Sequence, residues 1–549
     1  MRICLISREY PPDTGWGGVG AYTYQMAHAL VERGHDVEVI ALAAAKSAAG
    51  APGSSIAKNL AAPGWSETTS VTVHRVQWEE LLDELNLFLV CAPSTHYIVK
   101  SAIALWRKFL ELHTAHPFDV VEAPEHLAAG VFQGVTGVVP LVIKLHTPHS
   151  KFVAERFHNV LPSFDNQIIC LLERVTMLGA DLMCSPSFDL AKFVAGDLNI
   201  AVEDIAMARN PINTEWFSPD GKRAITKDAA TPETESIILF VGRLEERKGI
   251  SYLIKALPEI VRHVPQVRLV VVGADTNNGA DGGSVLSELQ QELAAAGLAG
   301  KVTFVPHVPL SEVANYYRSA DVCVVPSLYE NAPYTCIEAM SCGKAVVVTD
   351  AGGTREYVEH GVSGLVVPAR DSQALAKAVV TLLSDADLRQ QFGERARQYI
   401  VAECSRDVMT TRMESLYQNA IAIHASKRGA LYRKPATSAL SDALELLCAT
   451  DKAIFDVLYK QSIEFRMRYW FRFLKKRPGL CLATAALWLA EQLHAEPLVT
   501  RLRTAIAGKE SPRYGVTLAL GRPPVEHCVQ PVEIDETNPK IKANADVRP

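Results

Sequence analysis

The sequence lacks the features that mark several classes of protein. Its 11 cysteines are scattered, without a CxxC pair or a grouping with metal-ligand spacing, which favours reduced, buried thiols over disulfides or a zinc site. The longest apolar run, residues 480–490, is about half as long as a bilayer crossing requires. A formal net charge of −6 provides no basic footprint for nucleic acid.

The first residues also lack a charged segment followed by an apolar one, which is the pattern of a secretory leader. Instead, "MRICLISREYPP" is typical of a strand that runs into a Pro-Pro loop. We therefore expect a cytoplasmic protein that binds no nucleic acid and is at most peripheral on the cytoplasmic face of a membrane.

What the sequence does have is a regular alternation of apolar, strand-like runs with helical segments. Near-continuous Val, Ile and Leu runs are typical of parallel sheets that are covered by helices on both faces. There are too many for one compact sheet, and the polar, Pro-containing residues 210–236 divide them into two groups. The sequence predicts an α/β fold with two doubly wound, Rossmann-like domains facing a crevice, with ligands at the carboxyl ends of the strands. The runs are RICLIS, HDVEVIAL, FDVVEAP, PLVIKLH, DLMCSPS, SIILFVGRL, VRLVVVGA, VTFVPHV, DVCVVPS and KAVVVTD.

A glycine-rich loop follows the first predicted strand. Gly15, Gly17, Gly18 and Gly20 precede a helix that we expect to begin near Ala21. Glycines let backbone N–H groups approach a phosphate, and a helix N-terminus favours negative charge. The spacing is not that of a dinucleotide-binding GxGxxG loop, which disfavours NAD. Taken alone, the loop is equally well a flexible turn.

Cations and a histidine follow other predicted strands. Arg243 and Lys248 come after "SIILFVG" and would face the crevice, where a diphosphate needs charge neutralisation. The alternative is a pair of surface cations beside Glu245 and Glu246. His146 ends "VIKLH", where it could donate to a ligand or be structural.

The segment "LYENAPYTCIEAM", residues 328–340, places Glu330 and Glu338 eight positions apart. Thr335 and Glu338 have the spacing of a capping box, in which each side chain satisfies a backbone N–H at a helix start. In that interpretation Glu338 is structural and Glu330 is a solvated loop residue. The alternative is that both carboxylates bind a ligand. "DAGGTREYVEHGVSGLVVP" follows, with Gly352 and Gly353 after a strand and Gly361 and Gly364 before another.

In this order the motifs resemble the family-four retaining glycosyltransferases of the GT-B fold. The resemblance covers about residues 1–424 and is most specific over 321–368, which looks like the E-x7-E motif and the Gly-Gly-Thr-x-Glu turn of that family. It implies transfer of a sugar from a nucleoside-diphosphate sugar to a hydroxyl acceptor, a sugar or a lipid-linked sugar, in polysaccharide, glycolipid or other glycoconjugate synthesis. The implied enzyme is a retaining, metal-independent hexosyltransferase without a cofactor.

The resemblance also assigns roles to residues. Glu330 would contact donor-sugar hydroxyls, Glu338 the ribose, and Arg243 with Lys248 the diphosphate; these two cations, Glu330 and His146 form the implied catalytic set. A helix beginning at Thr335 would direct its dipole at the diphosphate. The implied donor-binding residues are Gly17, Gly18, Arg243, Lys248, Glu330, Asn331, Ala332, Pro333, Tyr334, Thr335 and Glu338.

Two segments depart from the family pattern. Pro211 in "ARNPINTEWFSP" stands where many members have glycine, and "DVVEAPE" lacks the commoner histidine, which leaves Glu122 and Glu125 as acceptor-side candidates. A metal is not implied, because the only DxD, Asp385 to Asp387, is better explained as a helix cap.

The resemblance divides the chain into parts. We expect an N-terminal acceptor-side domain at 1–212, a C-terminal nucleotide-sugar-binding domain at 213–406 and a crossover helix at 407–424 that returns to the first domain. A helical extension at 425–510 and a poorly ordered tail at 511–549 lie outside the resemblance.

The basic, aromatic residues 465–477 of the extension could lie on an anionic membrane or pack on the domains. The unexplained extension keeps a non-enzymatic sugar-nucleotide-binding scaffold open as an alternative function. Another enzyme on the same fold, such as a sugar-nucleotide epimerase or a phosphorylase, is a second alternative.

Overall fold

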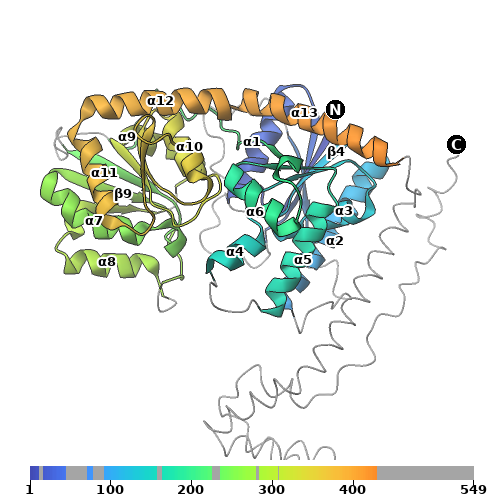
Figure 1. Ribbon diagram of the computed structural model, residues 1–549, viewed down its shortest axis with the longest axis horizontal. Helices are drawn as coiled ribbons and strands as arrows, with labels where there is room; N and C mark the ends of the chain where they lie inside the picture. Colours follow the sequence, from blue (N-terminus) through green and yellow to red (C-terminus); the bar gives the residue numbers. More distant parts are fainter. Residues whose placement is uncertain are drawn as a thin grey trace, which may run out of the picture. The chain divides into compact units, whose positions relative to one another are not determined.

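The computed structural model describes residues 1–11, 17–44, 71–77, 92–156, 163–225, 235–279, 283–306 and 308–428. These ranges form two parallel β-sheets with helices packed on them (Figure 1), which confirms the predicted α/β fold with two Rossmann-like domains. The predicted helical extension from residue 429 onward, the tail and the basic segment 465–477 lie outside the described residues.

The first sheet has seven strands in the order β3-β2-β1-β4-β5-β6-β7. Every residue of β4 is buried, since the centre of a helix-covered sheet is apolar on both faces. Its strands are β1 Arg2–Ser7, β2 Asp36–Leu42, β3 Thr72–Val76, β4 Val120–Pro124, β5 Leu141–Lys144, β6 Leu182–Ser185 and β7 Ile205–Met207. Its helices are α1 Gly18–Glu32, α2 Pro93–Ala115, α3 Val131–Thr136, α4 His149–Arg156, α5 Phe164–Leu178 and α6 Phe188–Leu198.

The second sheet has six strands in the order β10-β9-β8-β11-β12-β13. As in the first sheet, the strand order reverses at the centre, between β8 and β11, and ligands of such sheets bind beyond the strand ends at that point. Its strands are β8 Ser236–Val241, β9 Val267–Val272, β10 Val302–Val305, β11 Val322–Val325, β12 Ala345–Thr349 and β13 Gly364–Val367. Its helices are α7 Ile250–His263, α8 Val285–Ala295, α9 Leu310–Ser319, α10 Tyr334–Ser341 and α11 Ser372–Ser384.

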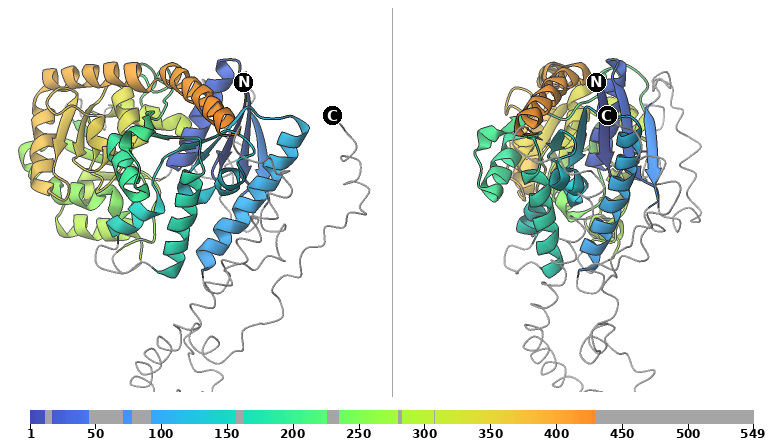
Figure 2. Two further views of the ribbon diagram at one scale, coloured as in Figure 1. Left: turned by 45° about the vertical axis from the view of Figure 1, so that its right-hand side comes forward. Right: turned by 90° about the vertical axis from the view of Figure 1, so that its right-hand side faces the viewer.

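Two further helices connect the sheets. α12 (Ala386–Cys404) contacts α10 and β12 of the second sheet, and α13 (Arg406–Arg428) contacts α1, β4 and β5 of the first (Figure 2). Tyr417 of α13 donates to the buried carboxylate of Glu122 in β4 at 2.6 Å. The chain thus returns to its first sheet through a helix whose contact includes a buried polar pair.

The ten strand-like runs named above all contain strands, but β3 and β7 were not predicted. Both are edge strands. β3 mixes polar with apolar residues and is only partly buried, and β7 has three residues. An edge strand has one neighbour and an open side, so it can be short or partly polar, and β3 and β7 therefore left little signal in the sequence.

Several local predictions were tested as well. Asp385 caps α12 by accepting from the N–H of Leu388, as predicted. α1 begins at Gly18 rather than near Ala21, and Gly364, expected to precede a strand, is the first residue of β13. Each of the seven cysteines in the described residues is a free thiol. Among the described helices, none is long and apolar enough to cross a membrane.

Candidate active site

Glu330 lies at the centre of a cluster of charges at the carboxyl ends of β8 and β11. Lys248 donates to its carboxylate oxygen Oε1, and Arg247 donates to the same oxygen at 2.9 Å. Both cations come from the turn η5 (Glu246–Lys248) that follows β8. Glycine follows this turn because Gly249 has a φ of +68° and an added Cβ would lie 1.9 Å from the carbonyl oxygen of Pro326. The turn can therefore approach the end of β11 closely.

The charges around Glu330 set its ionisation. Burial by itself would raise the pKa of its carboxyl group, but Lys248 and Arg247 outweigh this effect and lower the pKa below its ordinary value. The carboxylate side chain is only 12% exposed. Glu330 is therefore an ionised, partly desolvated hydrogen-bond acceptor, which suits hydroxyl groups.

Two glycines fix the backbone of the Glu330 loop. Gly353 donates its N–H to the carbonyl of Glu330 at 2.9 Å. An added Cβ on Gly353 would lie 2.0 Å from the carbonyl oxygen of Asn331, and Gly352 has a φ of +61°. The Gly-Gly turn after β12 is thus a close-packing surface for the loop that carries Glu330.

Glu338 is 7% exposed, and the capping-box interpretation is wrong. α10 begins at Tyr334, one residue earlier than expected, and its N-cap is Pro333, whose side chain makes no capping hydrogen bond. Glu338 instead accepts from the hydroxyl of Tyr317 in α9 at 2.8 Å. Burial raises the pKa of its carboxyl group to about 7, although Tyr317 and Lys248 oppose the rise.

His146 follows β5 of the first sheet. Both carboxylate oxygens of Glu125 accept its backbone N–H, at 2.8 and 2.9 Å. Its ring packs edge-on against Tyr22, with 5.2 Å between centroids. Burial, with smaller contributions from Lys144 and His126, lowers the pKa of His146 well below its ordinary value, so its imidazole is neutral.

The loops carrying Glu330 and His146 are in direct contact. The amide of Asn331 donates to the backbone carbonyl of His146 and to the hydroxyl of Thr147, the latter at 2.6 Å. The following Ala332 accepts from Asn210 at 3.4 Å. Pro333 is buried, and Tyr334 and Thr335 are half-buried at the start of α10.

Gly17, Gly18 and Arg243 lie outside the Glu330 cluster. Gly17 is the N-cap of α1 and Gly18 its first residue. The carboxylate of Glu9 packs on Gly17, where an added Cβ would lie 2.2 Å from Glu9 Oε2. The Arg243 side chain is 65% exposed and pairs with Glu245 at 3.4 Å. The structure therefore brings Lys248, but not Arg243, to Glu330.

Sequence reasoning missed two members of the site. Arg247 stands next to Lys248 in "ERKG", and a cation followed by a glycine turn was the available signal. Tyr317 lies on an apolar helix face and gave no signal of its role. Of the two acceptor-side candidates, Glu122 binds Tyr417 and belongs to the contact with α13, whereas Glu125 holds His146.

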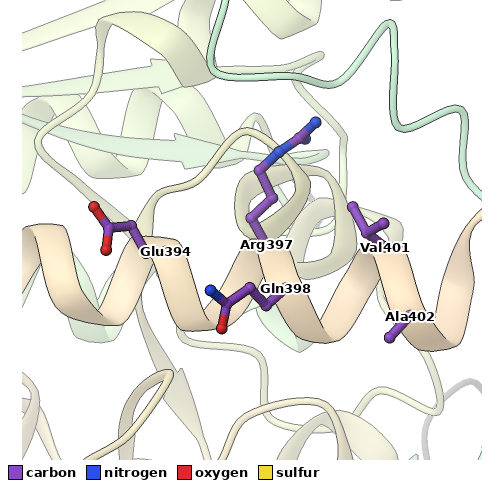
Figure 3. Close-up of a pocket in the computed structure, with 5 residues that line it drawn as sticks. All are labelled: Glu394, Arg397, Gln398, Val401 and Ala402. Atoms are coloured by element: carbon purple, nitrogen blue, oxygen red, sulfur yellow. The ribbon is translucent and has the colours of Figure 1, made fainter.

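A separate depression lies on one face of α12, away from these residues. It is lined by Glu394, Arg397, Gln398, Val401 and Ala402 (Figure 3). Arg397 directs its guanidinium away from Gln398 and donates to the backbone carbonyls of Thr214, Phe217 and Ser341. Its donors are therefore used by the fold. Within the described ranges, no group of three or more His, Cys, Asp or Glu side chains is arranged to hold a metal ion.

Comparison with known protein families identifies the chain. Residues 16–216 match the model described as "Glycosyltransferase Family 4" and residues 221–399 match "Glycosyl transferases group 1". The two Rossmann-like domains that these models cover have the GT-B fold. The chain belongs to the family-four, group 1 glycosyltransferases.

Individual glycosyltransferases are similar in sequence to more than three quarters of the chain. An uncharacterized glycosyltransferase of Methanocaldococcus jannaschii is 26% identical over 432 residues, which are 77% of this chain and 99% of that protein. D-inositol 3-phosphate glycosyltransferase of Stackebrandtia nassauensis is 25% identical over 453 residues, 78% of this chain and 95% of that one.

Solved structures show the same fold. Sucrose-phosphate synthase from Thermosynechococcus elongatus superposes with a TM-score of 0.60 at 23% identity, covering 77% of this chain and 99% of that one. HepE of Anabaena, solved in complex with UDP and glucose, superposes with a TM-score of 0.57 at 20% identity. The superposition covers 76% of this chain and 99% of HepE.

Proposed function

We propose that the protein is a retaining glycosyltransferase that moves a sugar from a nucleoside-diphosphate sugar to a hydroxyl acceptor. The observation that carries this proposal is the carboxylate of Glu330 held by Lys248 and Arg247 at the strand ends of the second sheet. The HepE structures with UDP and with UDP-glucose support a nucleotide-sugar donor of the same kind.

In the proposed mechanism, Glu330 accepts hydrogen bonds from donor-sugar hydroxyls and Glu338 from the ribose. A double displacement would need a free carboxylate nucleophile close to the anomeric carbon. Glu330 is ion-paired with two cations, which makes it a weak nucleophile and favours a hydroxyl-binding role. We therefore propose a same-face displacement in which the leaving diphosphate accepts the proton of the acceptor hydroxyl.

Cationic side chains replace a metal in this proposal. Lys248, with Arg243 after movement of its exposed side chain, would neutralise the diphosphate as it departs, together with the dipole at the start of α10. His146, neutral and at the end of β5, would contact the donor sugar. Gly17 and Gly18 would pack near the phosphates.

The proposed acceptor is a sugar or lipid-linked sugar, bound by the first sheet. We further propose that the protein works in the cytoplasm and attaches to a membrane surface through residues 465–477. Deleting residues 429–549 should then abolish binding to anionic liposomes, and unchanged binding would remove the membrane part of the proposal.

Thermal unfolding against UDP, GDP, ADP and NAD tests the donor class. A ligand at a hundred times its Kd stabilises the folded state by roughly 2.7 kcal/mol, so one nucleoside diphosphate should raise Tm clearly and NAD should not. Release of free sugar from the matching nucleotide sugars then identifies the donor. Absence of any diphosphate shift would favour a scaffold without donor binding.

A further inference from the structure

The turn after β4 has a strained backbone that the donor site does not explain. Leu127 and Ala128 have φ values of +52° and +50°, a left-handed conformation that residues other than glycine rarely adopt. They belong to the short turn η3 (His126–Ala128). Such strain persists only where the surrounding structure holds it, and it clusters at functional sites.

Two buried ionisable residues hold this turn. Glu173 of α5 accepts the N–H of Leu127 at 2.8 Å, and Arg8, which follows β1, donates to the carbonyl of Leu127 at 3.0 Å. Glu173 is 1% exposed and Arg8 is 7% exposed. Burying ionisable groups is costly. These two side chains hold Leu127 through the peptide groups on either side of it, which indicates that the shape of this turn matters.

The turn lies where a ligand of the first sheet is expected. β4 is the neighbour of β1 at the point where the strand order reverses, and ligands bind beyond the strand ends there. Glu125 and Ala128 are buried, whereas His126 and Leu127 between them keep part of their surface exposed. Of these two side chains, only that of His126 can form hydrogen bonds.

A short chain of contacts connects this turn to the donor carboxylate. Glu125, adjacent to His126, holds the backbone N–H of His146. The carbonyl of His146 accepts from Asn331, which follows Glu330. His126 thus lies on the first-sheet side of the position assigned to the donor sugar.

We propose that His126 is an acceptor-binding residue whose imidazole hydrogen-bonds a hydroxyl of a neutral polyol or sugar, and that the left-handed turn at Leu127 and Ala128 holds it in place. This inference rests on the proposed function and names the acceptor side of the same site.

The ionisation of His126 fits that ligand. Burial, with the charge of Arg8, lowers the pKa of His126 to about 4, so the imidazole is neutral at physiological pH. A neutral imidazole has one donor and one acceptor nitrogen, which matches a hydroxyl group. It offers no charge to a phosphate.

Competition between glycerol and water for the donor sugar tests the assignment. Full-length protein is incubated with the nucleotide sugar that it hydrolyses and a high concentration of glycerol, and glycosyl-glycerol is measured against free sugar. His126→Ala should lower the ratio about fivefold, the size expected for one lost hydrogen bond, through a smaller yield of glycosyl-glycerol. His116→Ala, at an exposed histidine of the same domain, should leave the ratio unchanged.

Two further variants separate binding from folding. His126→Asn keeps a polar group and should recover part of the ratio. Ala128→Gly should raise Tm, because glycine adopts a positive φ without strain, and should still lower the ratio by loosening His126. An unchanged ratio in both His126 variants overturns the inference, as does a wild-type protein that does not favour glycerol over water. A protein that consumes no nucleotide sugar overturns the proposed function instead.

Discussion

The amide nitrogen of Asn331 donates to the backbone carbonyl of His146, across 185 residues of sequence. Asn331 is 4% exposed, and its amide oxygen accepts from the hydroxyl of Tyr329. One side chain therefore fixes the loop after β11 against the loop after β5, directly beside Glu330.

Asn331→Asp should disrupt this junction. A carboxylate cannot donate to the carbonyl of His146, and it would place two oxygens against each other in a buried position. We expect the free energy of unfolding to fall by about 1–3 kcal/mol and sugar transfer to fall with it. Denaturant unfolding and an activity assay check this. Wild-type stability in Asn331→Asp would show that the contact contributes little.

Glu330→Gln and Lys248→Ala should each lower sugar transfer at least about tenfold, equivalent to about 1.4 kcal/mol of transition-state stabilisation. Glutamine keeps the size of the side chain but removes the charge that pairs with Lys248 and Arg247. Glu246→Gln is the matched control, because this carboxylate is exposed on the same turn. Near-normal turnover in the Glu330 variant would count heavily against the site.

Glu338→Gln should change how stability depends on pH. The pKa of Glu338 is about 7 in the folded protein, because of burial, and ordinary when unfolded. Between pH 4.5, the ordinary pKa, and pH 7, the folded-state pKa, the folded protein holds a proton that the unfolded chain has lost. This group therefore makes the free energy of unfolding fall as pH rises through that window.

The glutamine variant lacks this fall. Between about pH 5 and pH 8 its free energy of unfolding, relative to that of wild type, should rise by about 2–3 kcal/mol. Urea unfolding at each pH measures this. Glu394→Gln, at an exposed carboxylate of α12, should show no such gain. Parallel curves for wild type and Glu338→Gln would mean that Glu338 is ionised in the folded protein.

Glu356→Ala should destabilise the protein by removing the cap of α6, a helix that packs on the first sheet. Glu356 accepts the first two N–H groups of α6, from Phe188 and Asp189, both at 2.8 Å. It also pairs with Arg209 at 3.3 Å. Loss of this cap should lower the free energy of unfolding by about 1–2 kcal/mol, which is measured as a lower Tm. The control Glu359→Ala, at an exposed carboxylate, should have little effect on Tm.

Chelation should leave the activity intact. If cationic side chains neutralise the departing diphosphate, EDTA should not lower the rate of sugar transfer, and added Mg²⁺ should not raise it more than about twofold. A rate that falls with EDTA and returns with Mg²⁺ would contradict the metal-independent proposal.

Much of the fold was predictable because its signals are local. Buried parallel strands are continuous apolar runs, so β1 and β8 were visible directly, and the residues that follow them mark the sheet edge where ligands bind. The edge strands β3 and β7 were missed because a strand with one neighbour needs no such run. The capping-box error at Thr335 has a similar cause, since the spacing of two residues does not show which way Glu338 faces.

The sequence by itself determined that two parallel sheets form and that Glu330, Lys248 and His146 follow their strands, because strand and turn patterns depend on neighbouring residues. Only the tertiary structure decided that Arg247 rather than Arg243 pairs with Glu330. It also decided that Tyr317 donates to Glu338. Likewise, it decided that Arg8 and Glu173 hydrogen-bond to the backbone of Leu127. These pairings join residues far apart in the chain. They depend on strand order and helix packing, which no local pattern specifies.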